Sequence, residues 1–258
     1  MSHLQTLPNI MVAPNGARRT KKDHPALPIS ISETAATAIA CQKAGADGLH
    51  VHIRGKDDTH TLDAGLYLEA LQELEHVLPD FYVQITTEAV GQYTPQQQRD
   101  VVKKVMPKAV SISIAEMLSE GEEKQAKLFY DWCTESEISV QHIIYDVDDL
   151  ARIESMNLLN DDTPTQLLFV LGRYTKNQQS SPQDLTPFQN WVQRQNAKLD
   201  WAICAFGQGE TDCLVHAHQQ GGKVRIGFEN SLWHKDGSLA KDNAERVMEF
   251  IKYRDALS

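Results

Sequence analysis

Two histidines stand one residue apart in a short apolar run, at His50 and His52. In a β-strand the side chains of residues i and i+2 point to the same face, so this spacing predicts that both imidazoles project to one side. Neutral imidazole is a common ligand of zinc and of other transition metals. The pair therefore indicates one half of a metal site. The alternative is a hydrogen-bonded core histidine beside an incidental one.

Short β-branched runs alternate with longer amphipathic stretches along the whole chain. The expected strands cover about 10–13, 48–54, 81–87, 109–114, 140–145, 166–171, 200–205 and 223–229, and the expected helices about 32–43, 66–78, 96–105, 122–135, 148–158, 186–195, 210–219 and 242–253. Ser32 and the residues after it are candidate caps for the first helix, and Thr94 with Pro95 is the expected start of the third. Eight strand-helix pairs favour an α/β fold, a single (β/α)8 TIM barrel over residues 1–258, above a doubly wound open sheet.

Length alone allows a single barrel domain of about 250 residues or two smaller domains, and the composition is that of an ordinary soluble protein. The 258 residues carry a formal net charge of -10, which argues against nucleic acid or an anionic membrane as the main partner. No apolar run approaches the roughly 18 residues that span a bilayer, and no signal peptide is evident, so we expect a cytoplasmic protein. The four cysteines lack C-x-x-C spacing and are expected to be buried reduced thiols: Cys41, Cys133, Cys204 and Cys213.

In a (β/α)8 barrel the functional groups lie at the carboxyl ends of the strands. In chain order this rule selects Asn15 and Arg18, His50 and His52, Thr86, Thr87 and Glu88, Ser111, Ser113 and Glu116, Tyr145 and Asp146, Arg173 and Tyr174, Gln208, and Glu229 and Asn230. The set is polar where a bare scaffold would be apolar. By contrast, the spacing of Asp57, Asp58 and His60 fits a solvated turn, and we assign these three no role.

A carboxylate completes the candidate metal site. The second and eighth strands both neighbour the first in a closed barrel, so their ends lie roughly 10 Å apart and Glu229 can approach His50 and His52. Two imidazoles and one carboxylate with open positions are the ligands of catalytic zinc and of some non-haem iron sites, zinc being favoured for Lewis-acid chemistry. A solvated loop carboxylate is the alternative for Glu229. Arg225, four residues earlier in the same predicted strand, must pair with an acidic group or an anionic substrate.

Several short motifs in a fixed order resemble a known family. They are Asn15-Gly16-Ala17, Leu27-Pro28-Ile29, Ala44-Gly45-Ala46, His50 to Arg54, Gln84 to Thr87, Phe169 to Gly172, and Gly221 to Asn230. Together they resemble the β-keto acid cleavage enzymes, the family that includes 3-keto-5-aminohexanoate cleavage enzyme. The resemblance implies a zinc-dependent barrel, usually a homotetramer, that condenses a β-keto acid with acetyl-CoA and releases acetoacetate and a new acyl-CoA.

The resemblance also implies roles for particular residues. Zinc would bind to His50, His52 and Glu229 and make the carbon between the keto and carboxylate groups acidic. Arg225 matches an arginine that orients the catalytic carboxylate. The expected substrate contacts are Thr86, Thr87, Ser111, Arg18, Asn15 and Arg173.

Three positions depart from the family pattern. Asn230 stands where an aspartate commonly acts as the base, and Asn230 cannot take a proton, so Glu88 and Glu116 are the substitute candidates. Arg18 and Ile143 stand where the best-known member has glutamates, one of which meets the amino group of its substrate. An arginine and an aliphatic residue at these places favour an anionic or neutral substrate.

A basic stretch and two other functions complete the sequence-based expectations. Arg19, Lys21 and Lys22 follow the first strand and are candidates for contacts to CoA phosphates, with a solvated charged face as the alternative. Because Asn230 leaves the base unassigned, a zinc-dependent aldol or decarboxylative lyase that needs no CoA stays open. A metal-binding homologue without catalytic activity is the third possibility.

Overall fold

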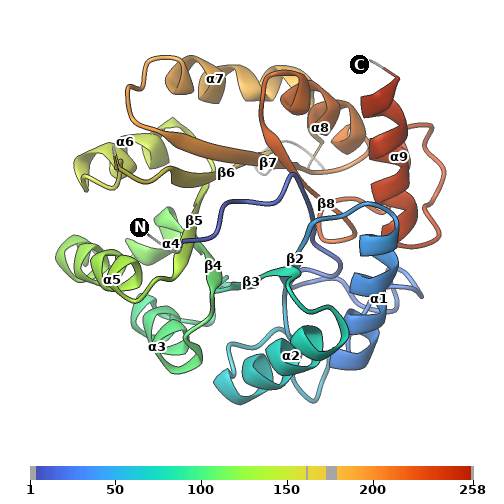
Figure 1. Ribbon diagram of the computed structural model, residues 1–258, viewed down its shortest axis with the longest axis horizontal. Helices are drawn as coiled ribbons and strands as arrows, with labels where there is room; N and C mark the ends of the chain where they lie inside the picture. Colours follow the sequence, from blue (N-terminus) through green and yellow to red (C-terminus); the bar gives the residue numbers. More distant parts are fainter. Residues whose placement is uncertain (1–3, 161, 173–178, 257–258) are drawn as a thin grey trace.

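The computed structural model describes residues 4–160, 162–172 and 179–256. Eight parallel strands pair in sequence order and close into a barrel, as Figure 1 shows in a view down its axis. The strands are β1 (Ile10–Val12), β2 (Gly48–Val51), β3 (Tyr82–Thr86), β4 (Ala109–Ser113), β5 (Ser139–Ile144), β6 (Thr165–Leu171), β7 (Leu199–Ala205) and β8 (Lys223–Ile226). The closed order confirms the predicted (β/α)8 barrel, and β1 pairs with both β2 and β8, as the metal-site prediction requires.

Helices form the outer layer around the barrel (Figure 1). They are α1 (Ile31–Lys43), α2 (Ala64–Val77), α3 (Pro95–Val105), α4 (Ile114–Met117), α5 (Glu123–Glu135), α6 (Val147–Ser155), the 3-10 helix η2 (Pro182–Leu185), α7 (Thr186–Val192), α8 (Glu210–Gln219) and α9 (Asn243–Asp255). The short helix α4, which the sequence reading missed, follows β4 directly and is capped by the Ser113 hydroxyl. The ring closes where α9 packs beside α1.

Local side-chain chemistry sets where the helices begin. Thr94 caps α3 with Pro95 at its first position, which confirms that prediction. The expected cap of α1 near Ser32 was wrong, because Ser30 is the cap residue. The Ser30 hydroxyl accepts from Glu33 N–H and the Glu33 carboxylate accepts from Ser30 N–H, which starts the helix one residue before Ser32.

The N-terminal segment covers the amino ends of the strands. Gln5 N–H donates to Ser139 Oγ at 2.7 Å and Leu7 N–H donates to Asp200 Oδ2 at 2.9 Å. These bonds fix the segment across the barrel, where the dark blue chain runs in Figure 1. The bottom of the barrel is therefore occupied by the chain itself, and the carboxyl ends of the strands provide the open mouth.

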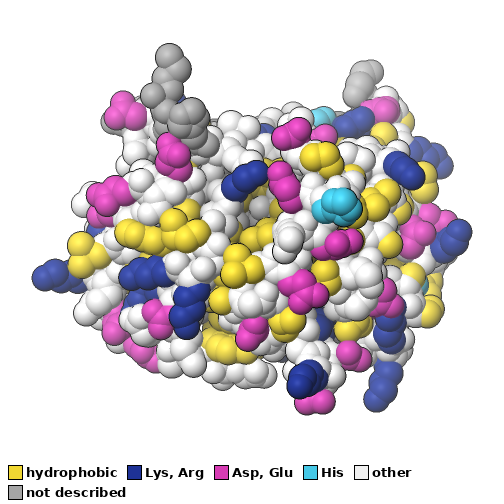
Figure 2. Space-filling model, turned by 60° about the horizontal axis from the view of Figure 1, so that its bottom comes forward, with side chains coloured by type: hydrophobic (Ala, Val, Ile, Leu, Met, Phe, Trp, Pro, Cys, Tyr) yellow, Lys and Arg dark blue, Asp and Glu magenta, His cyan; other side chains and the backbone are white. Residues whose placement is uncertain are grey.

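The cysteines, the helices and the surface charges bear on the expectations drawn from composition. All four cysteines are buried and free, as predicted. Among the described residues, no helix has both the length and the apolar character required to cross a membrane. Basic and acidic side chains are interspersed on the face shown in Figure 2.

Candidate metal centre

The predicted histidine pair and the predicted carboxylate meet at the barrel mouth. His50 lies on β2 and His52 follows the end of that strand, and their Nε2 atoms are 3.2 Å apart. Glu229 Oε2 lies 3.7 Å from His50 Nε2 and 3.3 Å from His52 Nε2. Both imidazoles are 1% exposed. The three side chains thus offer ligand atoms within 4.8 Å of one another.

The distances and the chemistry of these three side chains fit a divalent ion. In tetrahedral zinc sites, metal-nitrogen bonds of 2.0–2.1 Å place neighbouring ligand atoms about 3.3 Å apart. Glu229 Oε2 is buried and accepts no well-formed hydrogen bond from the described residues. A buried carboxylate oxygen of this kind is stable only beside positive charge. Two imidazole nitrogens and this oxygen are therefore arranged as ligands that a cation would satisfy.

Two glutamines orient the first imidazole. His50 Nδ1 donates to Gln84 Oε1 at 2.9 Å, which leaves the Nε2 lone pair directed toward the ligand cluster. The Gln84 amide is itself fixed, since its Nε2 donates to Gln141 Oε1 at 3.1 Å. Sequence reasoning quoted Gln84 in a motif but gave it no role. Its position two residues before Thr86, on the inward face of a buried strand, was the available signal.

His52 is held from its main chain and from its ring. The Asn15 amide donates to His52 O at 3.0 Å, so this predicted substrate contact also orients a ligand. The His60 ring packs 5.2 Å from the His52 ring, and His60 Nε2 donates to Glu88 O at 2.8 Å. The expectation that His60 belongs to a solvated turn was wrong, because the chain folds back and leaves it 5% exposed. Its partners are distant in sequence, and no local pattern indicates them.

Glu229 does not lie on a strand, which corrects the predicted extent of the eighth strand. β8 ends at Ile226, and Gly227 has φ +140, a conformation that other residues rarely adopt. A Cβ on Gly227 would lie 2.5 Å from Ala13 O, so the backbone needs glycine there. The chain then turns, and Glu229 Oε1 accepts from Arg225 Nη2 at 2.9 Å. The predicted contact between Arg225 and a carboxylate is present, although the two residues do not share one strand.

Burial and charge give His50 and Glu229 the protonation states that a metal requires. Burial, with the positive charge of Arg225, lowers the pKa of His50 well below its usual value. Burial alone would raise the pKa of Glu229. The positive charge of Arg225 is the largest opposing influence, and the pKa of Glu229 lies well below the usual range. Neutral imidazole beside ionised carboxylate is the state in which metals bind.

A cavity of about 280 Å³ opens above this cluster. Its wall contains these predicted residues: Asn15, Arg18, Arg19, Thr86, Glu88, Glu116 and Arg225. The far side, from β5 to β7, is largely apolar and contains Ile143, Val170 and Phe206. The volume suits a small organic acid. Ser113, named at a strand end but given no role, also lines it.

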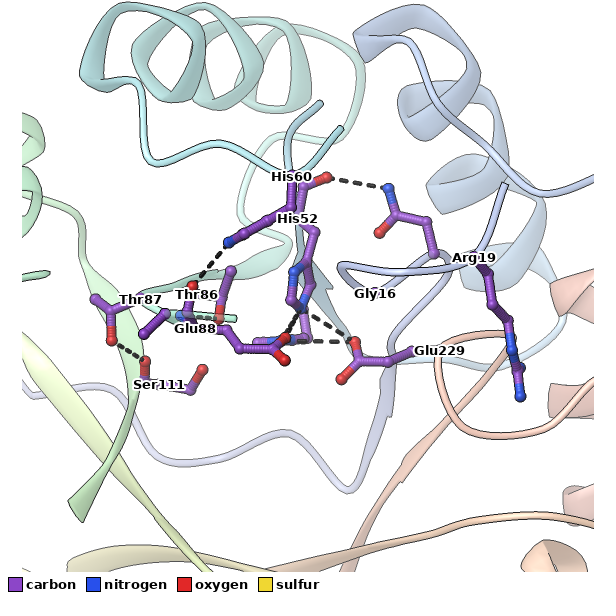
Figure 3. Close-up of polar contacts among 12 residues, drawn as sticks. Gly16, Arg19, His52, His60, Thr86, Thr87, Glu88, Ser111 and Glu229 are labelled. Atoms are coloured by element: carbon purple, nitrogen blue, oxygen red, sulfur yellow. Dashed lines mark hydrogen bonds and ion pairs between the residues drawn. The ribbon is translucent and has the colours of Figure 1, made fainter. Parts of the chain in front are cut away.

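Two carboxylates in this wall are candidate bases. Glu88 Oε2 lies 3.8 Å from His52 Nε2, and Figure 3 shows Glu88 and Glu229 approaching His52 from two sides. Glu116 Oε2 accepts hydrogen bonds from Ala89 N–H and Gln98 Nε2, each at 3.0 Å. The Glu116 carboxylate is thus already engaged by two donors, whereas the Glu88 carboxylate lies beside the ligand cluster.

Other predicted contacts do not reach the cavity wall. Thr87 Oγ1 donates to Ser111 O at 3.2 Å (Figure 3), and both residues are fully buried and are not among those that line the cavity. Asn230 is 1% exposed and is absent from the lining within the described residues, and neither polar atom of its amide has a hydrogen-bond partner among them. Arg173 lies outside the described residues.

The basic stretch divides into a half-buried arginine, Arg19, and exposed residues. Arg19 donates to Phe228 O and, at 3.3 Å, to Asn230 O, and its guanidinium lies away from His52 in Figure 3. Lys21 pairs with Glu33 at 2.7 Å. Lys22 is exposed, as is Arg18 at the cavity rim. Arg19 therefore ties the loop after β1 to the loop after β8.

Comparison with known proteins decides the family. The sequence profile of the beta-keto acid cleavage enzymes matches residues 9–258. This chain belongs to that family. The 3-keto-5-aminohexanoate cleavage enzyme of Fusobacterium nucleatum is 25% identical over 246 residues, which are 92% of this chain and 87% of the relative. The 3,5-dioxohexanoate:acetyl-CoA acetone transferase of Paraburkholderia graminis is 25% identical over 284 residues, 96% of this chain and 90% of the relative.

A third relative and a set of solved structures extend the comparison. The 3-oxoadipate:acetyl-CoA acetyltransferase of Cupriavidus necator is 23% identical over 246 residues, 92% of this chain and 85% of the relative. The structure of ObcA with a C4-CoA adduct and oxalate superposes with a TM-score of 0.71 at 14% identity, over 90% of this chain and 64% of that one. This chain thus spans less than two thirds of ObcA, and the likeness supports the fold alone. As a beta-keto acid cleavage enzyme, the protein is an acyltransferase that cleaves a carbon-carbon bond.

Proposed function

We propose that this protein is a zinc-dependent enzyme that condenses a β-keto acid with acetyl-CoA to give acetoacetate and an acyl-CoA. The observation that carries the proposal is the cluster of His50, His52 and Glu229, whose ligand atoms lie within 4.8 Å in a cavity of a family member. Two relatives named as acetyl-CoA-dependent transferases support the choice of cosubstrate. When bound, zinc supplies the positive charge that makes the carbon between the keto and carboxylate groups acidic.

Glu88 is the best-placed proton acceptor for this reaction. Its carboxylate lies beside the ligand cluster, 29% exposed and 3.8 Å from His52 Nε2. Asn230 has no basic atom, and the Glu116 carboxylate is already engaged by Ala89 N–H and Gln98 Nε2. Glu88 would remove the proton from the activated carbon of the keto acid. The resulting carbanion would then attack the thioester carbonyl of acetyl-CoA and expel the CoA thiolate. The thiolate would attack the keto carbonyl, and retro-Claisen cleavage would divide the adduct into acetoacetate, which regains the proton, and the new acyl-CoA.

Arg225 and Thr86 complete the proposed machinery. Arg225 donates to Glu229 Oε1, which keeps Glu229 Oε2 directed at the imidazoles. Thr86 Oγ1 lines the cavity and accepts from Glu88 N–H at 3.0 Å, so it fixes the backbone that carries the base. Its hydroxyl hydrogen is free to donate to a substrate oxygen. We retain Thr86 as a substrate contact, and Thr87 and Ser111 as supports beneath it.

The cavity favours a substrate without a positive charge. Ile143 contributes an apolar surface on the side opposite β2, and Val170 and Phe206 extend it. Arg18 stands at the rim and would attract an anionic end. An ammonium group on the substrate would meet an apolar wall and a like charge, so we propose a β-keto acid with a neutral or anionic side group.

The test combines metal removal with product analysis. The enzyme with zinc should convert a β-keto acid and acetyl-CoA into acetoacetate and the matching acyl-CoA, and His50→Ala should abolish turnover. Acetoacetate formation by metal-free enzyme would contradict the proposal. The second candidate, a lyase favoured by the presence of Asn230, would cleave the keto acid at full rate without any CoA ester. Zinc binding with no turnover on a broad panel of β-keto acids would identify a non-catalytic homologue.

A further inference from the structure

Glu229 is the ligand of the proposed metal centre that the strands do not position. His50 lies on β2 and is held by the ladder to β3, and His52 directly follows the strand, where the Asn15 amide donates to its carbonyl. Glu229 follows the glycine turn after β8, and its carboxylate must stay 3.3–3.7 Å from the two Nε2 atoms. The position of that carboxylate therefore depends on what fixes residues 227–230.

One contact to this turn comes from the start of α8. Glu210 is fully buried, and its Oε1 accepts from Gly227 N–H at 3.4 Å. Its Oε2 pairs with Arg246 Nη2 at 2.7 Å, and Arg246 of α9 is also fully buried. The carboxylate thus uses one oxygen for the turn and the other for a buried cation. Such a pair is costly to break, because the remaining charge would be left without compensation.

A second contact comes from the start of α9. Asn243 is 1% exposed, and its Oδ1 accepts from Phe228 N–H at 2.8 Å. Its Nδ2 donates to Pro14 O at 3.1 Å. One amide therefore links the loop after β1 to the loop after β8. A Cβ on Gly227 would lie 2.8 Å from Asn243 Oδ1, so the turn packs directly on this side chain.

We propose that Glu210 and Asn243 are positioning residues for the metal centre, which hold the turn 227–230 so that Glu229 reaches the two imidazoles. The inference rests on the proposed function, since it assigns these residues to the zinc site. Neither side chain touches a ligand atom of that site. Both act through backbone N–H groups, one and two residues before Glu229. Groups that orient metal ligands typically change metal affinity 10–100-fold when they are removed.

Two substitutions test the inference, each with a matched control. In Glu210→Gln, one of the two carboxylate oxygens is replaced by an NH2 group. That group faces either Gly227 N–H or the Arg246 guanidinium, both of which are donors, so one of the two hydrogen bonds is lost. Glu249→Gln is its control, because Glu249 also contacts Arg246 and Thr211 but makes no contact to the turn. Asn243→Ala removes both loop contacts. Its control is Asp242→Ala, which removes the cap of α9 from Glu245 N–H.

The readout is the zinc affinity of metal-free protein, measured by competition with a chelator, beside the thermal midpoint of the same metal-free samples. We expect Glu210→Gln and Asn243→Ala to weaken zinc binding 10–100-fold, and the controls less than threefold, at similar losses of thermal midpoint. Should Glu210→Gln not fold, Asn243→Asp tests the same point. It keeps the oxygen that accepts from Phe228 N–H but turns a second oxygen toward Pro14 O.

Two different outcomes would contradict two different claims. If wild-type protein binds zinc and His50→Ala does not, but both test variants bind as their controls do, Glu210 and Asn243 are structural only and the inference is overturned. If wild-type protein and His50→Ala bind zinc equally weakly, the zinc site itself is absent. That second result overturns the proposed function and the inference with it.

Discussion

Gly16 packs directly against the side chain of Glu229. A Cβ on Gly16 would lie 2.7 Å from Glu229 Cγ, and Gly16 has φ +60, where other residues are strained. The Gly16 carbonyl accepts from Arg54 Nη2 at 2.5 Å, and Arg54 also donates to Arg19 O. Arg54 therefore fixes the loop after β1, and this loop forms one wall of the space that Glu229 occupies.

Gly16→Ala should displace the Glu229 carboxylate. The new methyl group cannot move away, because Arg54 holds the loop, so Glu229 must shift and lose its place beside His52. We expect zinc affinity to fall at least 10-fold and turnover to fall with it. Zinc titration of the metal-free variant measures the effect. Gly91→Ala is a matched control, since Gly91 also has a positive φ but nothing lies within 4 Å of a Cβ there. Equal zinc affinity in the two variants would contradict the prediction.

Gln84→Leu should weaken the metal site without removing a ligand. The substitution leaves His50 Nδ1 without its acceptor, so the ring loses both its orientation and the tautomer that directs Nε2 to the cluster. We expect zinc to bind 10–100-fold more weakly. Gln84→Glu keeps an acceptor at the same place and should retain most of the affinity. A loss in Gln84→Glu as large as in Gln84→Leu would show that the acceptor is not what matters.

The barrel and the histidine pair were predictable because their signals are local. Alternating strand and helix patterns defined the architecture, and the spacing of His50 and His52 placed two imidazoles on one face. Gln84 and His60 were missed because their partners, His50 and Glu88, are 34 and 28 residues away in sequence. Nothing in a single chain specifies which buried polar groups pair across such separations.

The end of β8 is a feature that the local sequence pattern predicts wrongly. The run from Lys223 to Glu229 reads as a continuous strand, yet the structure ends it at Ile226. Gly227 could belong to a strand or to a turn on composition alone. The reason it turns is the nearby Ala13 carbonyl and the Asn243 amide, which exclude a side chain. Both belong to other elements of the fold, so only the assembled barrel determines where Glu229 lies.

Glu88→Gln should lower turnover and leave zinc bound. The amide cannot accept the proton of the activated carbon, and general bases commonly contribute 10²–10⁴-fold to rate. We therefore expect kcat to fall at least about 100-fold with unchanged zinc content, measured by acetoacetate formation and metal analysis. Glu116→Gln is the matched control and should have a smaller effect, because its carboxylate is already engaged by Ala89 and Gln98. A larger loss in Glu116→Gln would reverse the assignment of the base.

His142 should make the protein less stable in mild acid. His142 lies on β5, is 6% exposed and packs beside Tyr130 of α5. Burial lowers the pKa of His142 from 6.5 to about 4. Well above pH 6.5 the histidine is neutral in both the folded and the unfolded state, so it does not change the free energy of unfolding. As the pH falls from 6.5 toward 4, the unfolded chain binds the proton before the folded protein does, which favours unfolding. Between pH 7 and pH 5 this one residue lowers the free energy of unfolding by about 2 kcal/mol. Urea unfolding at both pH values should show a loss smaller by about that amount in His142→Phe than in wild type. Identical losses in the two proteins would refute the prediction.

The exposed lysines after β1 should affect acetyl-CoA and not zinc. Lys22 is exposed, and Lys21 pairs with Glu33 only at the surface, where such pairs contribute little. Lys21→Ala combined with Lys22→Ala should raise the KM for acetyl-CoA several-fold while zinc content stays constant, because two positive charges expected to attract the CoA phosphates are lost. The effect should shrink as salt is added. Lys103→Ala with Lys104→Ala removes equal charge from helix α3, away from this loop, and should leave that KM unchanged. An equal rise in both double variants would assign the effect to net charge and not to a CoA site.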